Sequence, residues 1–291
     1  MTVKYSICIA NYNMSETLIS SLTSILNQIN DYFEVIVVDD GSDDDSVEKL
    51  LQLKNSYENL RVIPLIRDSR RKLGETRNIS IRAARGKYVI LHIDTDDIWD
   101  QYIQSFTKIY HEIEKRLKIT DFMLSGKQIQ MATKNLLIDN PYRNVYYVED
   151  RLLWNELAVL GKLISIEHKP FFKRIPIKSS VKKLRKNIKV QCSSMTLVFL
   201  YSPSPVRNLN SYLKKIFFKS EWDFKLSALT LILLIPCFLS GYFSFKRKLI
   251  SQFKGNCRDL TIIDLKELEK NSHNDFGFFE LNDKERILFN M

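Results

Sequence analysis

The feature that most restricts the fold of this 291-residue chain is a β-α-β pattern in its first forty residues. Strand-like apolar runs cover residues 5–9 and 34–38, and each is followed by a polar turn, at residues 11–13 and 39–42. Between the two runs, apolar residues recur at helical spacing: Leu18, Ile19, Leu22, Ile25 and Leu26. Ligands bind outside the carboxyl ends of the strands in an open parallel sheet, so we expect both turns to border one crevice.

A third polar turn follows another apolar run and is strongly acidic. Residues 91–97 read Leu-His-Ile-Asp-Thr-Asp-Asp, which indicates a buried strand that delivers carboxylates into a site. Side chains alternate along a strand, so Asp94 and Asp96 are predicted to point the same way and to share one divalent cation. A solvated acidic turn is the alternative for this stretch taken alone. Asp97 can either join these two carboxylates or start the helix that contains Ile103, and the helix start is favoured because Asp is preferred at helix starts.

The order and spacing of these segments resemble family 2 of the glycosyltransferases, which are inverting enzymes with the GT-A fold. The resemblance covers about residues 4–168, through SICIANYN, FEVIVVDDGSDDDS, GETRNISIRAARGKYVILHIDTDDIW and VEDRLLWNELAVLGKLISI. It implies an α/β GT-A catalytic domain at residues 1–175, with a Rossmann-like nucleotide-binding half and a mixed central sheet. Residues 176–291 are then expected to form a mainly helical C-terminal region that is basic and apolar.

The resemblance implies a binding site for a nucleotide-sugar donor, with a UDP-sugar favoured. The donor-binding residues that it identifies are Ala10, Tyr12, Asp40, Arg77 and Asp94. An aromatic ring such as Tyr12 can stack on a nucleobase, and a carboxylate such as Asp40 can accept a hydrogen bond from the base. The guanidinium of Arg77 suits the oxygens of a diphosphate. An exposed arginine at the start of a helix is the alternative for Arg77.

The resemblance also supplies a cofactor and a catalytic base. Asp94 and Asp96 match the DxD motif of the family, with Mg²⁺ or Mn²⁺ as the metal that stabilises the departing nucleoside diphosphate. Inverting transfer needs a general base that takes the proton of the acceptor hydroxyl. Glu149 and Asp150 match the acidic pair of the family, so Asp150 is predicted to be the base and Glu149 to contact the acceptor or hold the loop. Helix capping is the alternative for either carboxylate.

The net charge of +10 is concentrated in the second half of the chain. Residues 169–189 contain nine Lys and Arg and no acidic residue, which indicates a polyanionic partner. No nucleic-acid-binding motif is evident, so a membrane surface is favoured over nucleic acid. A basic amphipathic helix is predicted at about residues 207–225. The uncharged segment 226–245 is long enough to cross a bilayer core, but Pro236 also allows a re-entrant or a buried-core helix.

The sequence thus predicts a metal-dependent inverting glycosyltransferase that acts on a lipid-linked saccharide at the cytoplasmic face of a membrane. The resemblance implies a cytoplasmic location, where nucleotide-sugar donors are available, and the basic and apolar C-terminal half predicts membrane association. The start of the chain without a signal-like leader and the four cysteines without paired spacing agree with a reduced compartment. The alternatives are a transferase with a soluble or protein acceptor, a non-catalytic sugar-nucleotide-binding subunit, and a nucleic-acid-binding protein. Residues 259–291 form a mixed-charge tail with no predicted function.

Overall fold

The computed structural model describes the chain in segments, at residues 2–145, 148–175, 192–193, 195–200, 205–218, 224–243 and 261–291. The chain divides into two compact units. The first unit consists of Met1–Asn144, Lys162–Pro176 and Leu260–Met291. The second unit consists of Val145–Gly161 and Ile177–Asp259.

The first unit is built on an eight-stranded sheet with the strand order β10-β8-β6-β7-β4-β1-β2-β3. Its N-terminal half is parallel and contains β1 (Tyr5–Asn11), β2 (Phe33–Asp39), β3 (Leu60–Pro64) and β4 (Tyr88–Leu91). Strands β2 and β4 are buried along their whole length. Helices cover parallel strands on both faces, so side chains on both faces are buried, and in β2 these include Glu34 and Asp39. The strands predicted at residues 5–9 and 34–38 are confirmed as β1 and β2.

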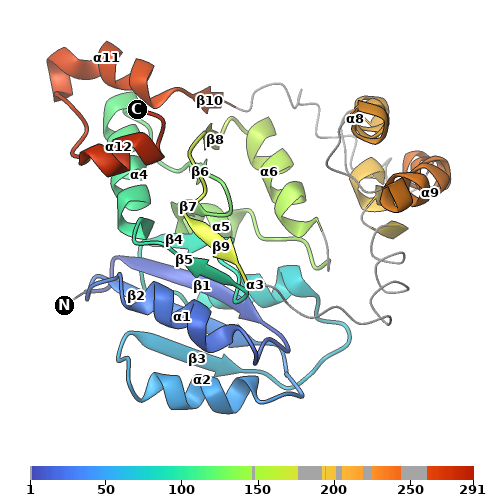
Figure 1. Cartoon of the computed structure of the whole chain (residues 1–291), viewed down its shortest axis with the longest axis horizontal. Coiled ribbons are helices and arrows are strands. Elements are labelled where there is room, and N and C mark those ends of the chain that lie inside the picture. Colours follow the sequence, from blue (N-terminus) through green and yellow to red (C-terminus); the bar gives the residue numbers. More distant parts are fainter. Residues whose placement is uncertain are drawn as a thin grey trace. The chain divides into compact units, whose positions relative to one another are not determined.

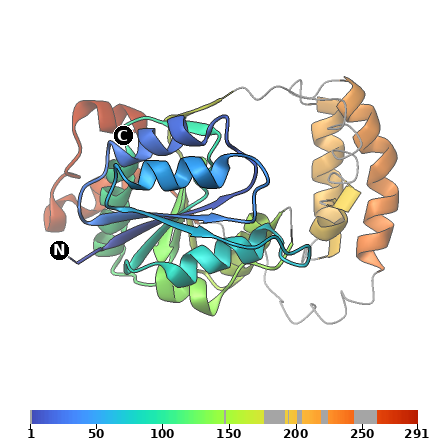
Figure 2. The same cartoon turned by 90° about the horizontal axis from the view of Figure 1, so that it is seen from below.

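Helices cover both faces of this parallel half. Helix α1 (Leu18–Leu26) and helix α2 (Ser46–Lys54) lie on one face, and α3 (Leu73–Ala83) lies on the other (Figure 2). The chain moves from β1 through β2 to β3 in one direction and then returns to β4, so right-handed crossovers place α3 opposite α1 and α2. The reversal between β1 and β4 is a topological switch point, and the crevice outside such a point is where α/β sheets bind ligands.

The other half makes the sheet mixed, as predicted. It contains β6 (Met123–Ser125), β7 (Gln130–Thr133), β8 (Leu163–Ile166) and β10 (Thr261–Ile263). Strand β7 runs antiparallel to both β4 and β6, whereas β8 and β10 continue parallel to β6. The remaining elements are the antiparallel pair β5 (Asp97–Trp99) and β9 (Phe172–Arg174) and the helices α4 (Ile103–Leu117) and α5 (Lys134–Asp139).

The C-terminal residues belong to the first unit. Strand β10 extends the sheet, and α11 (Leu265–Phe276) and α12 (Asp283–Leu288) lie beside α4 (Figure 1). The guanidinium of Arg116 on α4 donates to the Ser272 hydroxyl at 2.8 Å and lies 4.2 Å from the ring centre of Phe279. Apolar side chains of the C-terminal segment 260–291 are buried in the main core of the first unit. The structure therefore assigns this segment to the first unit, whereas the sequence suggested one boundary near residue 176.

The described part of the second unit is helical, as predicted. It contains α6 (Glu149–Val159), helical residues at 192–193 and 195–200, α8 (Pro205–Phe218) and α9 (Phe224–Tyr242). Its small core is formed by Met195, Phe199, Leu234 and Cys237. The predicted amphipathic helix corresponds to α8 and the predicted uncharged segment to α9. No helix among the residues described here combines the length and hydropathy needed to span a membrane. Most of the predicted basic stretch, residues 176–189, lies outside the described residues.

Candidate functional site

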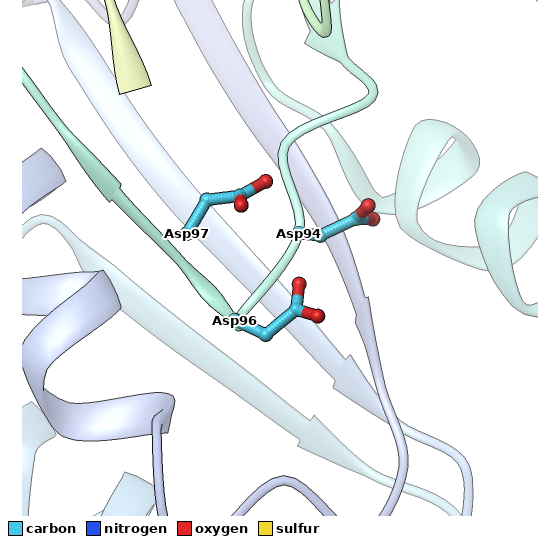
Figure 3. A group of neighbouring side chains, drawn as sticks. All are labelled: Asp94, Asp96 and Asp97. Carbon is cyan, nitrogen blue, oxygen red and sulfur yellow. The ribbon is translucent and has the colours of Figure 1, made fainter. Parts of the chain in front are cut away.

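Three carboxylates meet between the end of β4 and the start of β5 (Figure 3). One oxygen from each of Asp94, Asp96 and Asp97 lies within 4.8 Å of the others. Strand β4 ends at Leu91, and His92 adopts a left-handed backbone conformation with φ of 65°. The predicted grouping of Asp94 with Asp96 is therefore present, but a loop brings the two together rather than the alternation of side chains along a strand.

Asp97 is the third member of this cluster, and the helix-start prediction for it was wrong. Residues Asp97–Trp99 form β5, and α4 begins only at Ile103. The Asp97 side chain is fully buried and lies opposite Arg174, its register partner on β9. An interior carboxylate on a strand needs a charged or hydrogen-bonding partner. The pairing of β5 with β9 provides this partner.

Arg174 bridges the cluster with its guanidinium. Its Nε and Nη2 donate to the two oxygens of Asp97 at 2.6 and 3.1 Å, and its Nη1 donates to Asp96 Oδ2 at 2.8 Å. Its Nη2 also lies 3.9 Å from Asp94 Oδ2. Burial raises the pKa of Asp96 and of Asp97 above the ordinary value, although Arg174 acts in the opposite direction. The sequence reading grouped Arg174 with the basic stretch and gave no sign of this contact.

Two further side chains hold Asp94. Gln128 donates from Nε2 to Asp94 Oδ2 at 2.9 Å, and Arg77 Nη2 lies 3.8 Å from Asp94 Oδ1. The Gln128 loop is supported in turn by buried His168, whose Nε2 accepts a hydrogen bond from the Lys127 N–H at 2.8 Å. Burial lowers the pKa of His168, which favours the neutral ring that this contact requires. Arg77 is buried and not exposed as in the alternative for it, and its contact with a diphosphate stays a prediction. No motif identified Gln128.

The carboxyl ends of β1 and β2 are tied to the acidic loop through Asn11. This buried side chain donates to Asp39 Oδ2 at 2.8 Å and accepts from the Thr95 hydroxyl at 3.1 Å. Asp39 also accepts from the N–H and the hydroxyl of Ser42, at 2.8 and 2.6 Å. One hydrogen-bonded network therefore fixes the three chain segments that border the crevice.

The predicted base-binding residues lie at the ends of the same strands. The Tyr12 ring is 42% exposed, and the guanidinium carbon of Arg67 lies 4.3 Å from its centre. Arg67 and Arg71 both donate to the carboxylate of Asp40, which is buried. Ala10 is half-buried near the end of β1. Tyr12 and Asp40 are thus brought together through Arg67, and Arg71 is a further partner of Asp40.

The predicted catalytic pair opens α6 in the second unit. Glu149 is buried and Asp150 is half-buried, and both lie in the first helical turn, where the helix dipole favours a negative charge. Asp150 Oδ1 accepts a hydrogen bond from the Arg151 N–H at 2.6 Å. Both residues lie inside the helix, whose N-cap is Val148, and the catalytic role of the pair stays a prediction.

The chemistry of the acidic cluster fits a hard divalent cation. Carboxylate oxygens are the ligands that Mg²⁺ and Mn²⁺ prefer, and Asp94, Asp96 and Asp97 present them within 4.8 Å of one another. The guanidinium of Arg174 already sits against these oxygens, which shows that the site accommodates positive charge.

Comparison with known proteins gives one family match and several relatives. The sequence profile of Glycosyl transferase family 2 matches residues 6–155. A poly(ribitol-phosphate) beta-glucosyltransferase of Bacillus spizizenii is 40% identical over 97 residues, which cover 33% of this chain and 15% of that protein. The Escherichia coli enzyme WfaP, a UDP-Glc:alpha-D-GlcNAc-diphosphoundecaprenol beta-1,3-glucosyltransferase, is 32% identical over 185 residues, 54% of this chain and 70% of that protein. This chain spans less than two thirds of the length of several curated relatives that it matches.

Solved structures share the fold at low sequence identity. The S. aureus protein TarS (1–349), in complex with UDP-GlcNAc, matches with a TM-score of 0.54 and 15% identity, over 85% of this chain and 84% of that one. The mannosyltransferase PcManGT from Pyrobaculum calidifontis, in complex with GDP-Man and Mn²⁺, matches with a TM-score of 0.54 and 13% identity, over 87% and 84%. These neighbours confirm the predicted α/β GT-A fold.

Proposed function

This chain belongs to glycosyl transferase family 2, and on that premise we propose that it is a metal-dependent inverting glycosyltransferase. It moves a sugar from a nucleotide-sugar donor to an acceptor hydroxyl. The observation that carries the proposal is the acidic cluster of Asp94, Asp96 and Asp97, which lies beyond the carboxyl end of β4. Thr95, within the same loop, is hydrogen-bonded to Asn11 at the end of β1.

The donor is a nucleotide-sugar, with UDP as the favoured nucleotide. In this proposal the nucleobase of the donor stacks on Tyr12 and donates a hydrogen bond to Asp40, while Arg77 faces the diphosphate. Asp94 and Asp96 would hold Mg²⁺ or Mn²⁺, and the bound ion would offset the charge that develops on the leaving diphosphate. The E. coli relative is named for UDP-Glc, and the S. aureus structure contains UDP-GlcNAc, which supports the choice of UDP.

Asp150 is the proposed general base, and Glu149 the proposed acceptor contact. The acceptor oxygen attacks the anomeric carbon from the side opposite the nucleotide, its proton passes to the Asp150 carboxylate, and the nucleoside diphosphate leaves with the bonding electrons. Configuration at the anomeric carbon is inverted. Asp150→Asn keeps the shape of the side chain but removes the proton acceptor, so turnover should fall at least about 100-fold while donor affinity changes little. Near-normal turnover would move the base to Glu149 or elsewhere.

The proposed acceptor is a lipid-linked saccharide at the cytoplasmic membrane face. The E. coli relative is named for a diphosphoundecaprenol-linked acceptor. Residues 177–259 carry sixteen Lys and Arg against three Asp and Glu, which suits an anionic lipid surface. An exposed apolar stripe at helical spacing is formed by Ile232, Ile235 and Leu239 of α9 together with Phe243, the residue after the helix. We place this stripe, called the α9 stripe below, in the lipid interface.

A polymer acceptor in solution is the second candidate. It is favoured by the Bacillus relative, which is 40% identical over the matched residues and is named for poly(ribitol-phosphate). The alternative of a non-catalytic sugar-nucleotide-binding subunit is less consistent with the complete acidic cluster.

A transfer assay with purified full-length protein tests the proposal. UDP-sugars and GDP-sugars are each offered with Mn²⁺ and either a diphosphate-linked lipid saccharide or a soluble glycan polymer. We expect nucleoside diphosphate release with a UDP-sugar, stimulated by the lipid-linked acceptor and abolished by chelator. Stimulation by the polymer alone would select the second candidate. Donor binding with no transfer to either acceptor would support the non-catalytic subunit.

A further inference from the structure

Arg174 occupies the part of the acidic cluster that a divalent cation would also occupy. Its Nη1 donates to Asp96 Oδ2 at 2.8 Å, while Nε and Nη2 hold the two oxygens of Asp97. A backbone hydrogen bond of 2.8 Å from the Ile175 N–H to the Asp96 carbonyl keeps β9 against the loop. Asp96 cannot offer the same oxygen fully to a metal ion while the guanidinium is bound to it.

The charges of these side chains nearly cancel. Asp94, Asp96 and Asp97 contribute three negative charges, while Arg174 and Arg77 contribute two positive charges within 4.0 Å of them. The attraction of this cluster for a divalent cation is therefore much smaller than the attraction of three bare carboxylates. Metal binding becomes favourable only when an arginine leaves or when further negative charge arrives.

A nucleoside diphosphate supplies both changes. Its phosphate oxygens add negative charge, and they also offer a guanidinium a second partner of suitable geometry. The exposed fraction of the Arg174 side chain is 52%, compared with 36% for Asp94, 13% for Asp96 and none for Asp97. The arginine thus has the most room to move, whereas Asp96 and Asp97 are enclosed.

We propose that Arg174 is an internal counterion that makes metal binding depend on nucleotide binding. Resting on the glycosyltransferase function proposed above, this assigns to Arg174 a positioning role: it neutralises the carboxylates in the empty site and yields Asp96 to the metal when the diphosphate enters. By linkage, the nucleotide then strengthens metal binding and the metal strengthens nucleotide binding by the same factor. Free divalent metal alone binds weakly.

The test measures Mn²⁺ affinity of the full-length protein by electron paramagnetic resonance of free Mn²⁺, with and without UDP. The variant is Arg174→Gln, and the matched control is Lys173→Gln, which removes the same charge from an exposed neighbour on β9. Removal of a charge next to the cluster should tighten Mn²⁺ binding without UDP by about tenfold after allowance for solvent screening. The factor by which UDP strengthens Mn²⁺ binding should fall by a similar amount, whereas Lys173→Gln should behave as the wild type.

A second pair of variants separates this role from a structural one. Arg174→Gln leaves buried Asp97 without the Arg174 contact, which can unfold the protein. We therefore also compare Asp97→Asn with the double variant Asp97→Asn/Arg174→Gln. Both lack the buried charge of Asp97, and thermal melting checks that each is folded. Tighter Mn²⁺ binding in the double variant than in Asp97→Asn supports the proposal.

The counterion role would be overturned if Arg174→Gln bound Mn²⁺ as tightly as Lys173→Gln and the double variant bound it as tightly as Asp97→Asn, with UDP-dependent binding intact. The proposed function would then still stand. Failure of the wild type to bind Mn²⁺ even with UDP present would overturn both.

Discussion

Asn11 shows how one side chain can hold a site together. It joins the end of β1 to Asp39 at the end of β2 and to Thr95 in the acidic loop. The sequence drew attention to the turn that contains Asn11, but a side-chain bridge between strands adjacent only in space has no signature in the sequence.

We predict that Asn11→Ala lowers the free energy of unfolding by about 1–3 kcal/mol, because the Asp39 and Thr95 groups lose a buried partner. Urea denaturation followed by circular dichroism measures this change. Asn55→Ala, at the exposed C-terminal end of α2, is the control and should change stability by less than about 0.5 kcal/mol. Equal stability of the two variants would contradict the bridging role of Asn11.

Tyr12 provides a second test at this scale. If a nucleobase stacks on its ring, Tyr12→Ala should weaken UDP binding by about 1–3 kcal/mol, roughly 5- to 150-fold, whereas Tyr12→Phe keeps the ring and should bind nearly as well. Isothermal titration calorimetry with UDP and Mn²⁺ gives both affinities. Wild-type affinity in the alanine variant would remove Tyr12 from the base site.

At the scale of elements, Glu34 on β2 links the amino ends of β1, β2 and β3 through hydrogen bonds. Its carboxylate accepts from Ser6 on β1 at 2.6 Å, from Arg61 on β3 at 2.8 Å and from the Arg85 N–H at 2.7 Å. Burial acts to raise the pKa of Glu34, but these three donors outweigh it and hold the pKa below its ordinary value. A lowered pKa means that the carboxylate stabilises the fold at neutral pH and that this contribution is lost as the pH falls through the folded-state value.

Glu34→Gln should therefore cost about 2 kcal/mol of unfolding free energy at pH 7, through weaker hydrogen bonds, and less at pH 3. Urea unfolding at both pH values measures this difference. The control is Glu58→Gln, at an exposed position before β3, which should be neutral at both. A cost for Glu34→Gln that is independent of pH would contradict the assignment of the ionised form.

The C-terminal helices α11 and α12 stabilise the first unit, although the sequence suggested that residues 259–291 form a tail. Phe289 follows α12, is 1% exposed and packs against the rings of His168 and Phe171. Phe289→Ala should destabilise the first unit by about 3–5 kcal/mol, whereas Phe278→Ala, at a site 68% exposed, should cost less than about 1 kcal/mol. Thermal melting of both variants tests this, and equal melting temperatures would show that the C-terminal helices are dispensable.

The sequence predicted the strands and helices whose own residues show a clear apolar periodicity. Strands β1 and β2 and helix α1 combine apolar periodicity with polar turns, so their positions followed from the sequence. Strands β9 and β10 have three residues each, too few for periodicity, and they form only because β5 and β8 accept them as partners. Arg174 was missed for this reason, since the pairing that brings it to Asp97 spans 77 residues of sequence.

At the scale of the whole molecule, the charge of the chain is divided between its two units. The net charge of +10 arises from the second unit, whose residues 177–259 are strongly basic and include the α9 stripe. A basic surface with an exposed apolar helix face is typical of proteins that bind anionic membranes from one side.

We predict that Ile235→Glu/Leu239→Glu weakens binding to vesicles containing anionic lipid at least about tenfold, because two apolar side chains lose their burial in the interface. Co-sedimentation measures the binding, and Ser240→Glu, beside the α9 stripe on the same helix, is the control. Undiminished vesicle binding would reject the α9 stripe as the membrane contact, and tight RNA binding unaffected by the substitutions would redirect the basic region to nucleic acid.

The most direct test of the account is the metal dependence of nucleotide binding at the acidic cluster. Calorimetric titration of UDP into the full-length protein is performed with Mn²⁺, with excess chelator, and with Asp96→Asn in the presence of Mn²⁺. We predict measurable UDP affinity only for the wild type with Mn²⁺, and a loss of at least about tenfold in the other two cases. Full UDP affinity in excess chelator, or in Asp96→Asn, would contradict the assignment of this cluster as the metal and donor site.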